Sequence, residues 1–390
     1  MIRIYYAERD TTLYEKHPER NTGIDEILEL TKIQSGSRAF ENGTDLGIQA
    51  NTYNSRILID FGSEINALSQ SIVSGEIPVL DNGHITSASV FLSLRATEAS
   101  DLLQSYTIKA YPVSESWFNG TGTFDDTPET KIGSSWFNRS GDAKAQTGRA
   151  WNTASAHSGG TSTGATEVIG GGTWITGSTF EASQSFQNES PDLRINVTDI
   201  VQNWLSGSAT NNGFLLKRPH ADEIDGEIRG SIKFFGRESH TIFVPRLEVV
   251  FDDSAIGASA DAITSNTYVP YFKNIKAEYR TSEIARFFVG VRPEFPTKTY
   301  ATSSFYITKD LLPISSSYEI IDSVTNEVIV KDEKIFGNST TKISTNLSDG
   351  SFFDLRMDSF LPERFYKIKL TCRRTNDTQT FDDFHFKVVN

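Results

Sequence analysis

The sequence predicts an all-β fold in which one β-sandwich is followed by a second, smaller one. Three observations support this prediction. Most periodic segments alternate apolar and polar residues, these segments are rich in β-branched and aromatic side chains, and Gly, Asn, Asp or Ser bounds them. The 390 residues also exceed one typical domain, and a hydrophobic content of 37% is enough for two packed cores.

The first domain is expected over residues 1–253, and strand patterns begin at its first residues. Ile2, Ile4 and Tyr6 occupy alternate positions of a first strand. The same period recurs at 57–61, 88–94, 106–111 and 247–251. Because the start is not a charged segment followed by an apolar run, we expect no secretory signal and synthesis in a cytoplasm. No stretch approaches the roughly 18 consecutive apolar residues of a membrane-spanning helix, so we expect no membrane insertion.

Two short segments of the first domain depart from the period of two. Apolar residues fall at helical spacing in both of them: Ile65, Leu68 and Ile72 in the first, and Val197, Val201 and Trp204 in the second. In the second segment Asn196 or Thr198 can cap the start, and Gly207 lies just past the end. We therefore expect one short helix there, packed over the end of the first sandwich.

Charge and cysteine content exclude several classes of protein. A formal net charge of −13 argues against a general nucleic-acid-binding role, because phosphate binding depends on Lys and Arg side chains that release counterions. The single cysteine, Cys372, permits neither an intramolecular disulfide nor a multi-cysteine metal site. We expect it to be a small buried apolar residue, so that packing alone supplies stability.

An ordered series of short motifs runs through the first domain. The series is DTTL (10–13), NTG (21–23), RILIDF (56–61), ITSA (85–88), YPV (111–113), GTG (120–122), NVTDIVQNW (196–204), NNGFLL (211–216), FFGRES (234–239) and PRLEV (245–249). In this series the chain resembles DNRLRE-type β-sandwiches, which are jelly-rolls related to carbohydrate-binding modules. The resemblance covers roughly residues 1–253 and implies a jelly-roll there. Most of these motifs also have a purely structural reading, as turns, strand ends and core positions.

The chain departs from this family between residues 153 and 186, where Gly, Ser and Thr dominate. Gly170, Gly171 and Gly172 lie in this insertion and suggest a glycine-turned hairpin, although the flanks lack a hydrophobic period. Unstructured loops longer than about 12 to 15 residues are uncommon in compact domains. We therefore expect a neighbouring subunit to hold the insertion in place.

Sugar binding is the functional reading that aromatic side chains favour, because aromatic faces stack on pyranose rings. All five tryptophans lie in the first domain: Trp117, Trp136, Trp151, Trp174 and Trp204. Trp204 is on the apolar face of the expected helix, and Trp117 and Trp136 follow strands, so these three are expected to be structural. Trp151 and Trp174, which lie next to and within the insertion, are the candidates for contact with a ligand or partner.

Catalytic and metal-binding motifs are weak in this sequence. The six histidines are scattered without ligand spacing. Acidic pairs occur at Asp125-Asp126, Asp252-Asp253 and Asp382-Asp383, where turns favour Asp for local hydrogen bonds. Calcium binding or glycosidic chemistry remains an alternative for such pairs. We expect a protein that is not an enzyme and that has no cofactor and no metal site.

A small-residue stretch at 254–267 predicts a linker, and a second domain is expected over 268–390. Its strand patterns lie at 287–291, 305–307, 318–322, 327–330, 352–355 and 365–370, with a hairpin turn at 324–327. Their spacing predicts an antiparallel, immunoglobulin-like sandwich without the tryptophan and cysteine pair of antibody domains. The strings LPISSSYEIID (312–322) and ERFYKI (363–368) resemble terminal domains on structural proteins of tailed bacteriophages, over roughly residues 288–390.

Together these resemblances imply a virion protein that is synthesised and assembled in the host cytoplasm. We expect a structural component of the neck, tail or baseplate of a tailed bacteriophage, present as a homo-oligomer and contacting other virion structural proteins. The alternative is a receptor-binding protein for host-surface polysaccharide. A third class, a polysaccharide-degrading enzyme, would release reducing ends from the host capsule.

Overall fold

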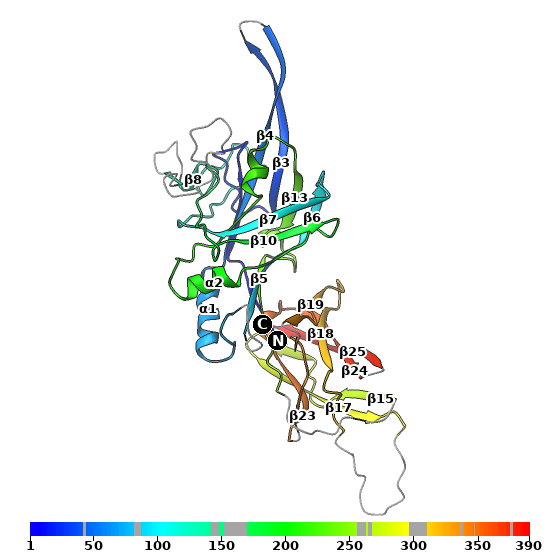
Figure 1. Ribbon diagram of the computed structural model, residues 1–390. Helices are drawn as coiled ribbons and strands as arrows, with labels where there is room; N and C mark the ends of the chain where they lie inside the picture. The colour runs from blue at the N-terminus through cyan, green and yellow to red at the C-terminus, as the bar shows by residue number, and fades with distance from the viewer. Residues whose placement is uncertain are drawn as a thin grey trace, which may run out of the picture. The chain divides into compact units, whose positions relative to one another are not determined.

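The computed structural model describes residues 1–41, 44–81, 87–141, 148–151, 170–255, 263, 267–295, 310–335, 338–346, 348–374 and 377–390. Over these residues the chain is nearly all β, with several antiparallel sheets, which confirms the predicted fold class (Figure 1). The chain divides into two compact units. The N-terminal unit comprises Tyr5–Glu76 and Ser89–Glu248, and the C-terminal unit comprises Met1–Ile4, Ile77–Ala88 and Val249–Asn390.

This division differs from the single boundary expected after residue 253, because three short segments belong to the C-terminal unit instead. The amino group of Met1 donates to the carbonyls of Phe251 and Thr340, and the Ile4 amide donates to Ser359 Oγ at 3.3 Å. The expected linker also includes a packed residue. Ile263 is buried, and its amide donates to the Leu311 carbonyl at 2.9 Å.

Two sheets and a small ribbon make up most of the N-terminal unit. The larger sheet has the order β10-β7-β12-β4-β3-β13-β6, with β2 paired to β4. Its strands are β2 (Arg9–Tyr14), β3 (Ile27–Glu41), β4 (Thr44–Asp60), β6 (Ala96–Ser100), β7 (Ser105–Pro112), β10 (Ala182–Gln187), β12 (Phe214–Lys217) and β13 (Gly230–Phe235). The smaller sheet has the order β1-β14-β5-β11, with β1 (Ile2–Tyr6), β14 (Arg246–Val250), β5 (Ser89–Leu94) and β11 (Leu193–Asn196). Of these strands, β5 and β11 belong entirely to the N-terminal unit, and the unit boundaries fall within β1 and β14. A two-stranded ribbon joins β8 (Asn138–Ser140) to β9 (Arg149–Ala150).

Burial follows the sequence patterns in these strands. The four residues of β12, which lies between β7 and β4, are all buried, whereas β13 alternates buried and half-buried residues. Consecutive strands also change sheet, since β5 and β11 lie in the smaller sheet and β6 and β10 in the larger one. The alternation from which the fold class was predicted is seen in β13 of the larger sheet and in β11 of the smaller one, whereas β12 is buried throughout. The jelly-roll connection pattern stays a prediction.

The predicted helix is present as α2 (Thr198–Leu205), in which Ile200, Val201 and Trp204 are buried. Its start is held by Asn196, whose Oδ1 accepts from the Thr198 amide at 3.1 Å, and the Trp204 ring lies 4.6 Å from that of Phe214. The first helical pattern corresponds to α1 (Gly62–Val73), and a short α3 (His220–Ile224) was not predicted. Among the described residues, no helix is long and apolar enough to span a membrane.

A long hairpin extends beyond the larger sheet. Strand β13 pairs with β3 no further than Lys32, and β12 pairs with β4 no further than Ile57. From the pair Ile33 and Tyr53 to the pair Glu41 and Thr44, β3 and β4 pair with each other. We call residues 33–41 and 44–53 the β3–β4 ribbon; Figure 1 shows it projecting past the other strands of its sheet.

The C-terminal unit is a sandwich of two sheets. One has the order β15-β17-β23-β22, from β15 (Tyr268–Phe272), β17 (Ile284–Pro293), β22 (Ser344–Asn346) and β23 (Gly350–Arg356). The other has the order β16-β25-β24-β18-β19, from β16 (Glu278–Arg280), β18 (Ser317–Asp322), β19 (Val328–Val330), β24 (Arg364–Arg373) and β25 (Thr378–Val389). Aromatic rings join the sheets: Phe353 stacks on Tyr318 at 4.0 Å, and Phe287 lies 5.7 Å from Phe386.

The predicted turn in this unit is also present, between β18 and β19. Asn326 has a left-handed backbone with φ of 57°, and Asp322 Oδ1 accepts from the amides of Val324 and Thr325. Cys372 is buried, as expected. The strand predicted at 305–307 lies outside the described residues.

Candidate functional site

The two tryptophans proposed as ligand contacts lie in the core of the N-terminal unit. Trp151 is 3% exposed and Trp174 is 6% exposed. The indole Nε1 of Trp151 donates to the Ser135 carbonyl at 2.9 Å, and Trp174 forms a bridge with Val113 at the end of β7. One cluster of buried residues contains both rings: Leu13, Leu58, Tyr111, Val113, Trp117, Trp136, Trp151, Trp174 and Leu215.

Cations cover the ring of Trp174. The Arg56 guanidinium lies 5.1 Å from its centroid and 4.9 Å from that of Trp136, and Lys217 Nζ also lies 5.1 Å from Trp174. A sugar needs an open aromatic face, which neither Trp151 nor Trp174 presents. The structure thus corrects the expectation for these two residues, because both rings are occupied in packing against the unit's own side chains.

The same core contains a buried cluster of charges. Arg56 on β4 makes two hydrogen bonds to Glu223 on α3, Nε to Oε1 at 3.0 Å and Nη2 to Oε2 at 2.8 Å. Lys217 Nζ lies 2.6 Å from the same carboxylate. Burial by itself raises the pKa of Glu223, but the charges of Arg56 and Lys217 outweigh it and hold that pKa below its ordinary value. Burial lowers the pKa of Lys217 to about 8.

This cluster also anchors Gly170 and Gly171, within the glycine-rich insertion. Arg56 Nη1 donates to the carbonyls of Gly170 and Gly171 at 3.1 and 2.9 Å. A Cβ at Gly171 would lie 2.7 Å from Arg56 Nη1 and 2.8 Å from Trp136, and its φ of +76° is one that only glycine adopts readily. The described part of the insertion, 170–186, is therefore held by this chain itself, which corrects the expected role of a neighbour there. Residues 152–169 lie outside the described residues.

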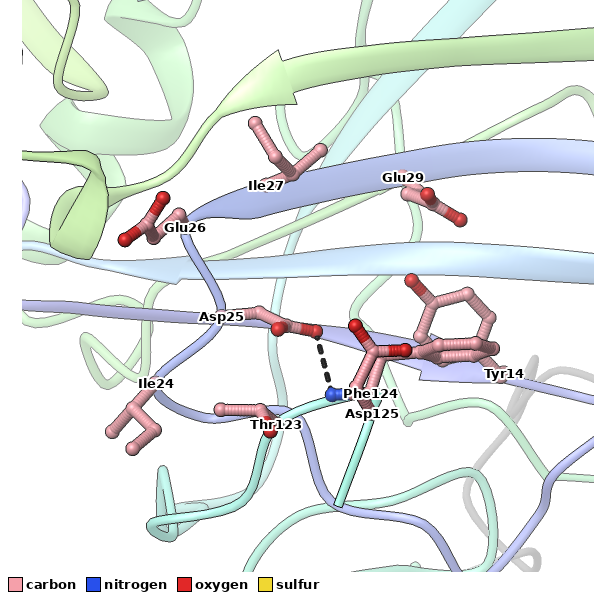
Figure 2. A pocket seen from close by; sticks show the side chains of 9 residues that line it. All are labelled: Tyr14, Ile24, Asp25, Glu26, Ile27, Glu29, Thr123, Phe124 and Asp125. Atoms are coloured by element: carbon pink, nitrogen blue, oxygen red, sulfur yellow. Dashed lines mark hydrogen bonds between the residues drawn. The ribbon is translucent and has the colours of Figure 1, made fainter.

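A pocket of about 470 Å³ opens elsewhere on the N-terminal unit (Figure 2). It is formed where the end of β2, the start of β3 and the loop at 123–125 come together. Its lining residues are Tyr14, Ile24, Asp25, Glu26, Ile27, Glu29, Thr123, Phe124 and Asp125. Four of these carry carboxylates and none carries a basic group, so the pocket is acidic.

The carboxylates of the pocket interact through their charges. Burial, together with the charges of Glu29, Asp125 and Asp126, raises the pKa of Asp25 to about 6, although the Phe124 amide donates to Asp25 Oδ2 at 3.1 Å. Figure 2 shows this bond and the Asp125 side chain near it. Carboxylates in such a setting accept hydrogen bonds from hydroxyl or ammonium groups, so the pocket suits a polar, neutral or cationic ligand.

Aromatic rings line one side of the pocket but offer limited stacking surface. Tyr14 is buried, with its ring centroid 4.9 Å from that of Phe124. The Arg20 guanidinium lies 4.6 Å over the Phe124 ring. The pocket is thus better suited to hydrogen bonding than to stacking a sugar ring.

The acidic pairs singled out in the sequence have different environments. Asp125 lines the pocket, whereas Asp126 accepts from the amide and hydroxyl of Thr123 at 3.0 and 2.8 Å and so closes a turn. In the C-terminal unit Asp253 pairs with the Met1 amino group at 3.1 Å, and Asp382 with Lys367 at 3.2 Å. Within the part of the chain that is described, no group of three or more His, Cys, Asp or Glu side chains could hold a metal ion.

No family model and no curated protein matches this sequence. Among solved structures, the chain is similar to the crystal structure of Parabacteroides merdae β-glucuronidase with glycerol in its active site. The sequence identity is 10% and the TM-score is 0.16, and the match covers 79% of this chain and 28% of that chain. A TM-score this low carries no argument about fold or activity.

Proposed function

We propose that this chain is a structural component of a tailed-bacteriophage particle, in the neck, tail or baseplate, where several copies act as an assembly or attachment module. The proposal rests for its biology on the two resemblances of the sequence. The structural feature that supports it is the β3–β4 ribbon, a long two-stranded element with no further strand beside it in the described chain. Elements of this kind present backbone groups for pairing with another chain.

The interior of the N-terminal unit supports a positional role. Its tryptophans and its buried charges are used in packing, as with Trp174 between Arg56 and Lys217. Side chains committed in this way define a rigid shape and leave recognition to edges and loops. On this proposal the chain acts by occupying a fixed position and contacting its neighbours.

Mass spectrometry of particles purified from cells that produce this chain would test the proposal. We expect several copies per particle, at a fixed ratio to the other virion proteins. Particles that contain no copies would refute a structural role. Electron cryomicroscopy of the same particles would then locate the chain in the neck, tail or baseplate.

The acidic pocket favours a second candidate function, binding of a host-surface polysaccharide. Its carboxylates can accept hydrogen bonds from sugar hydroxyls or amino-sugar ammonium groups. Calorimetric titration with capsular or cell-wall polysaccharide would test this function on Asp25→Ala, with Asp101→Asn as a matched control outside the pocket. Binding that Asp25→Ala abolishes and Asp101→Asn retains would favour receptor binding; absence of binding by the unaltered chain would reject it.

A further inference from the structure

The β3–β4 ribbon has open edges along its length. At the base of the ribbon, Lys32 of β3 pairs with β4 on one side and with β13 on the other, and Ile57 of β4 pairs with β2 on one side and with β12 on the other. Beyond Lys32 on β3 and Ile57 on β4, the outer edge of each strand has no further strand beside it in the described chain. Edge N–H and C=O groups are a template for pairing with another strand, and an isolated two-stranded ribbon is only marginally stable in water. A partner that covers an edge would therefore stabilise the ribbon.

The two edges are not equivalent. From Arg38 to Phe40 strand β3 advances two residues, while the partner positions on β4 advance three, from Ile48 to Asp45. The extra residue is a bulge in β4, and a bulge locally disrupts the ladder of the strand that carries it. The outer edge of β3 is thus the regular one and the better template.

The low charge of the ribbon favours another copy of this chain as its partner. Of the 21 residues from 33 to 53, the charged ones are Arg38, Glu41 and Asp45, which gives a net charge of −1 in a chain of net charge −13. Copies of a strongly acidic protein repel one another, and a nearly neutral arm lets them meet with little repulsion. Natural edge strands that avoid association instead carry charges, especially Lys.

We propose that the outer edge of β3 in the ribbon pairs antiparallel with the same edge of a second copy, about a two-fold axis at Ser37. This register places Ile33 opposite Glu41 and Arg38 opposite Gly36, so no like charges face each other across the axis. The same surface on both copies forms the interface, which closes as a dimer. The inference deepens the proposed function, on which it rests, by naming the partner of the ribbon.

A shortened chain tests the role of the ribbon. Replacing residues 34–52 by Asn-Gly closes the hairpin at the pair Ile33 and Tyr53 with a two-residue turn, and it leaves the pairing of β3 with β13 intact. We expect the full chain to dimerise and the shortened chain to be monomeric in light scattering after size exclusion. Their urea midpoints should be equal at concentrations at which both are monomeric. The same oligomeric state for both chains, or a full chain that is monomeric up to its solubility limit, would overturn the proposal.

Single cysteines test the register. Because Cys372 is buried, it should not compete with a thiol introduced by Ser37→Cys. Under oxidised glutathione we expect Ser37→Cys to form a disulfide-linked dimer and the control Ser208→Cys, at an exposed position outside the ribbon, to remain monomeric. Equal cross-linking of the two variants would reject pairing at Ser37.

The two proposals fail in different ways. If the full and shortened chains enter particles equally, the chain is a virion protein but the ribbon is not its assembly arm. If the full chain dimerises through Ser37 and is absent from particles, the ribbon inference stands and the virion role fails.

Discussion

Arg56 and Glu223 form a bidentate ion pair in the interior of the N-terminal unit. Their side chains are 0% and 1% exposed, and the two hydrogen bonds between them measure 3.0 and 2.8 Å. Moving two charges out of water is costly, so such a pair is sustained only by good geometry and additional hydrogen bonds. Arg56 obtains these from the carbonyls of Gly170 and Gly171. The pair thereby connects β4, α3 and these two glycines of the insertion.

Glu223→Ala should destabilise the N-terminal unit strongly. The substitution leaves Arg56 and Lys217 buried without a counter-charge, for which we expect a loss of about 3–5 kcal/mol in the free energy of unfolding. Glu227→Gln, at an exposed position three residues after α3, should change that free energy by no more than about 0.5 kcal/mol. Urea unfolding followed by tryptophan fluorescence measures both. A small effect of Glu223→Ala would show that water reaches the cluster.

Gly171→Ala should cost more than Gly207→Ala, although both glycines have nearly the same backbone. Their φ angles are +76° and +75°, but a Cβ at Gly171 meets Arg56 and Trp136, whereas a Cβ at Gly207 has no atom within 4 Å. Gly207→Ala should therefore lower the free energy of unfolding by about 1 kcal/mol through backbone strain alone. Gly171→Ala should lower it further, because its Cβ also overlaps Arg56 and Trp136. Thermal melting of the two variants compares them directly. Equal losses would mean that the segment around Gly171 moves away from Arg56 at little cost.

Trp151→Ala and Trp174→Ala should behave as core substitutions. Removing either buried indole should lower the free energy of unfolding by about 3–5 kcal/mol. The control Phe118→Ala, at an aromatic residue 50% exposed, should lower it by about 1 kcal/mol or less. Chemical denaturation distinguishes these cases. A Trp174→Ala protein of normal stability that had lost glycan binding would instead reinstate Trp174 as a ligand contact.

Asp10 should make the stability of the N-terminal unit depend on pH. Burial raises its pKa from 3.8 to about 7, although its Oδ2 accepts from the Arg237 amide at 2.7 Å. The folded state therefore binds a proton more tightly than the unfolded state, so the contribution of Asp10 to stability is greatest below pH 4 and is lost as pH rises to about 7. Asp10→Asn, which keeps an acceptor for the Arg237 amide, should remove this dependence.

We compare the free energy of unfolding of Asp10→Asn with that of the unaltered chain. From pH 5 to pH 8 the difference between the two free energies should shift by about 2 kcal/mol in favour of the variant. Urea unfolding at the two pH values gives this number. Asp101→Asn is the control, because Asp101 is exposed and its φ of 54° suits Asn. A pH-independent difference between Asp10→Asn and the unaltered chain would mean that Asp10 stays ionised in the fold.

Much of the fold could be predicted because its signals are local. The segments with a period of two became β5, β7, β18 and β24, and the helical spacing at Val197, Val201 and Trp204 became α2. In each of these, alternation or helical spacing matches one buried face, and turn residues mark the ends. Such information lies within ten residues and needs no knowledge of distant partners.

The candidate site could not be predicted in this way. Trp174 lies between Thr173 and Ile175 in a glycine-rich stretch without a clear period. Nothing local indicated that Arg56 and Lys217, from two other strands, would cover its ring. Similarly, Asp25 and Asp125 are 100 residues apart and meet only because the loop at 123–125 packs beside the start of β3. Contacts between distant segments determine both the covering of the Trp174 ring and the lining of the pocket. A single sequence shows no pattern for such contacts.

The discontinuous make-up of the C-terminal unit has a consequence for how the polypeptide can be divided. Its segments Met1–Ile4 and Ile77–Ala88 precede or interrupt the N-terminal unit in the sequence, so the backbone passes between the units at 4–5, 76–77, 88–89 and 248–249. Truncation after residue 253 would deprive Met1 of the Thr340 carbonyl to which its amino group donates. During translation, Met1 and Ile4 must likewise wait for most of the chain before Thr340 and Ser359 emerge from the ribosome.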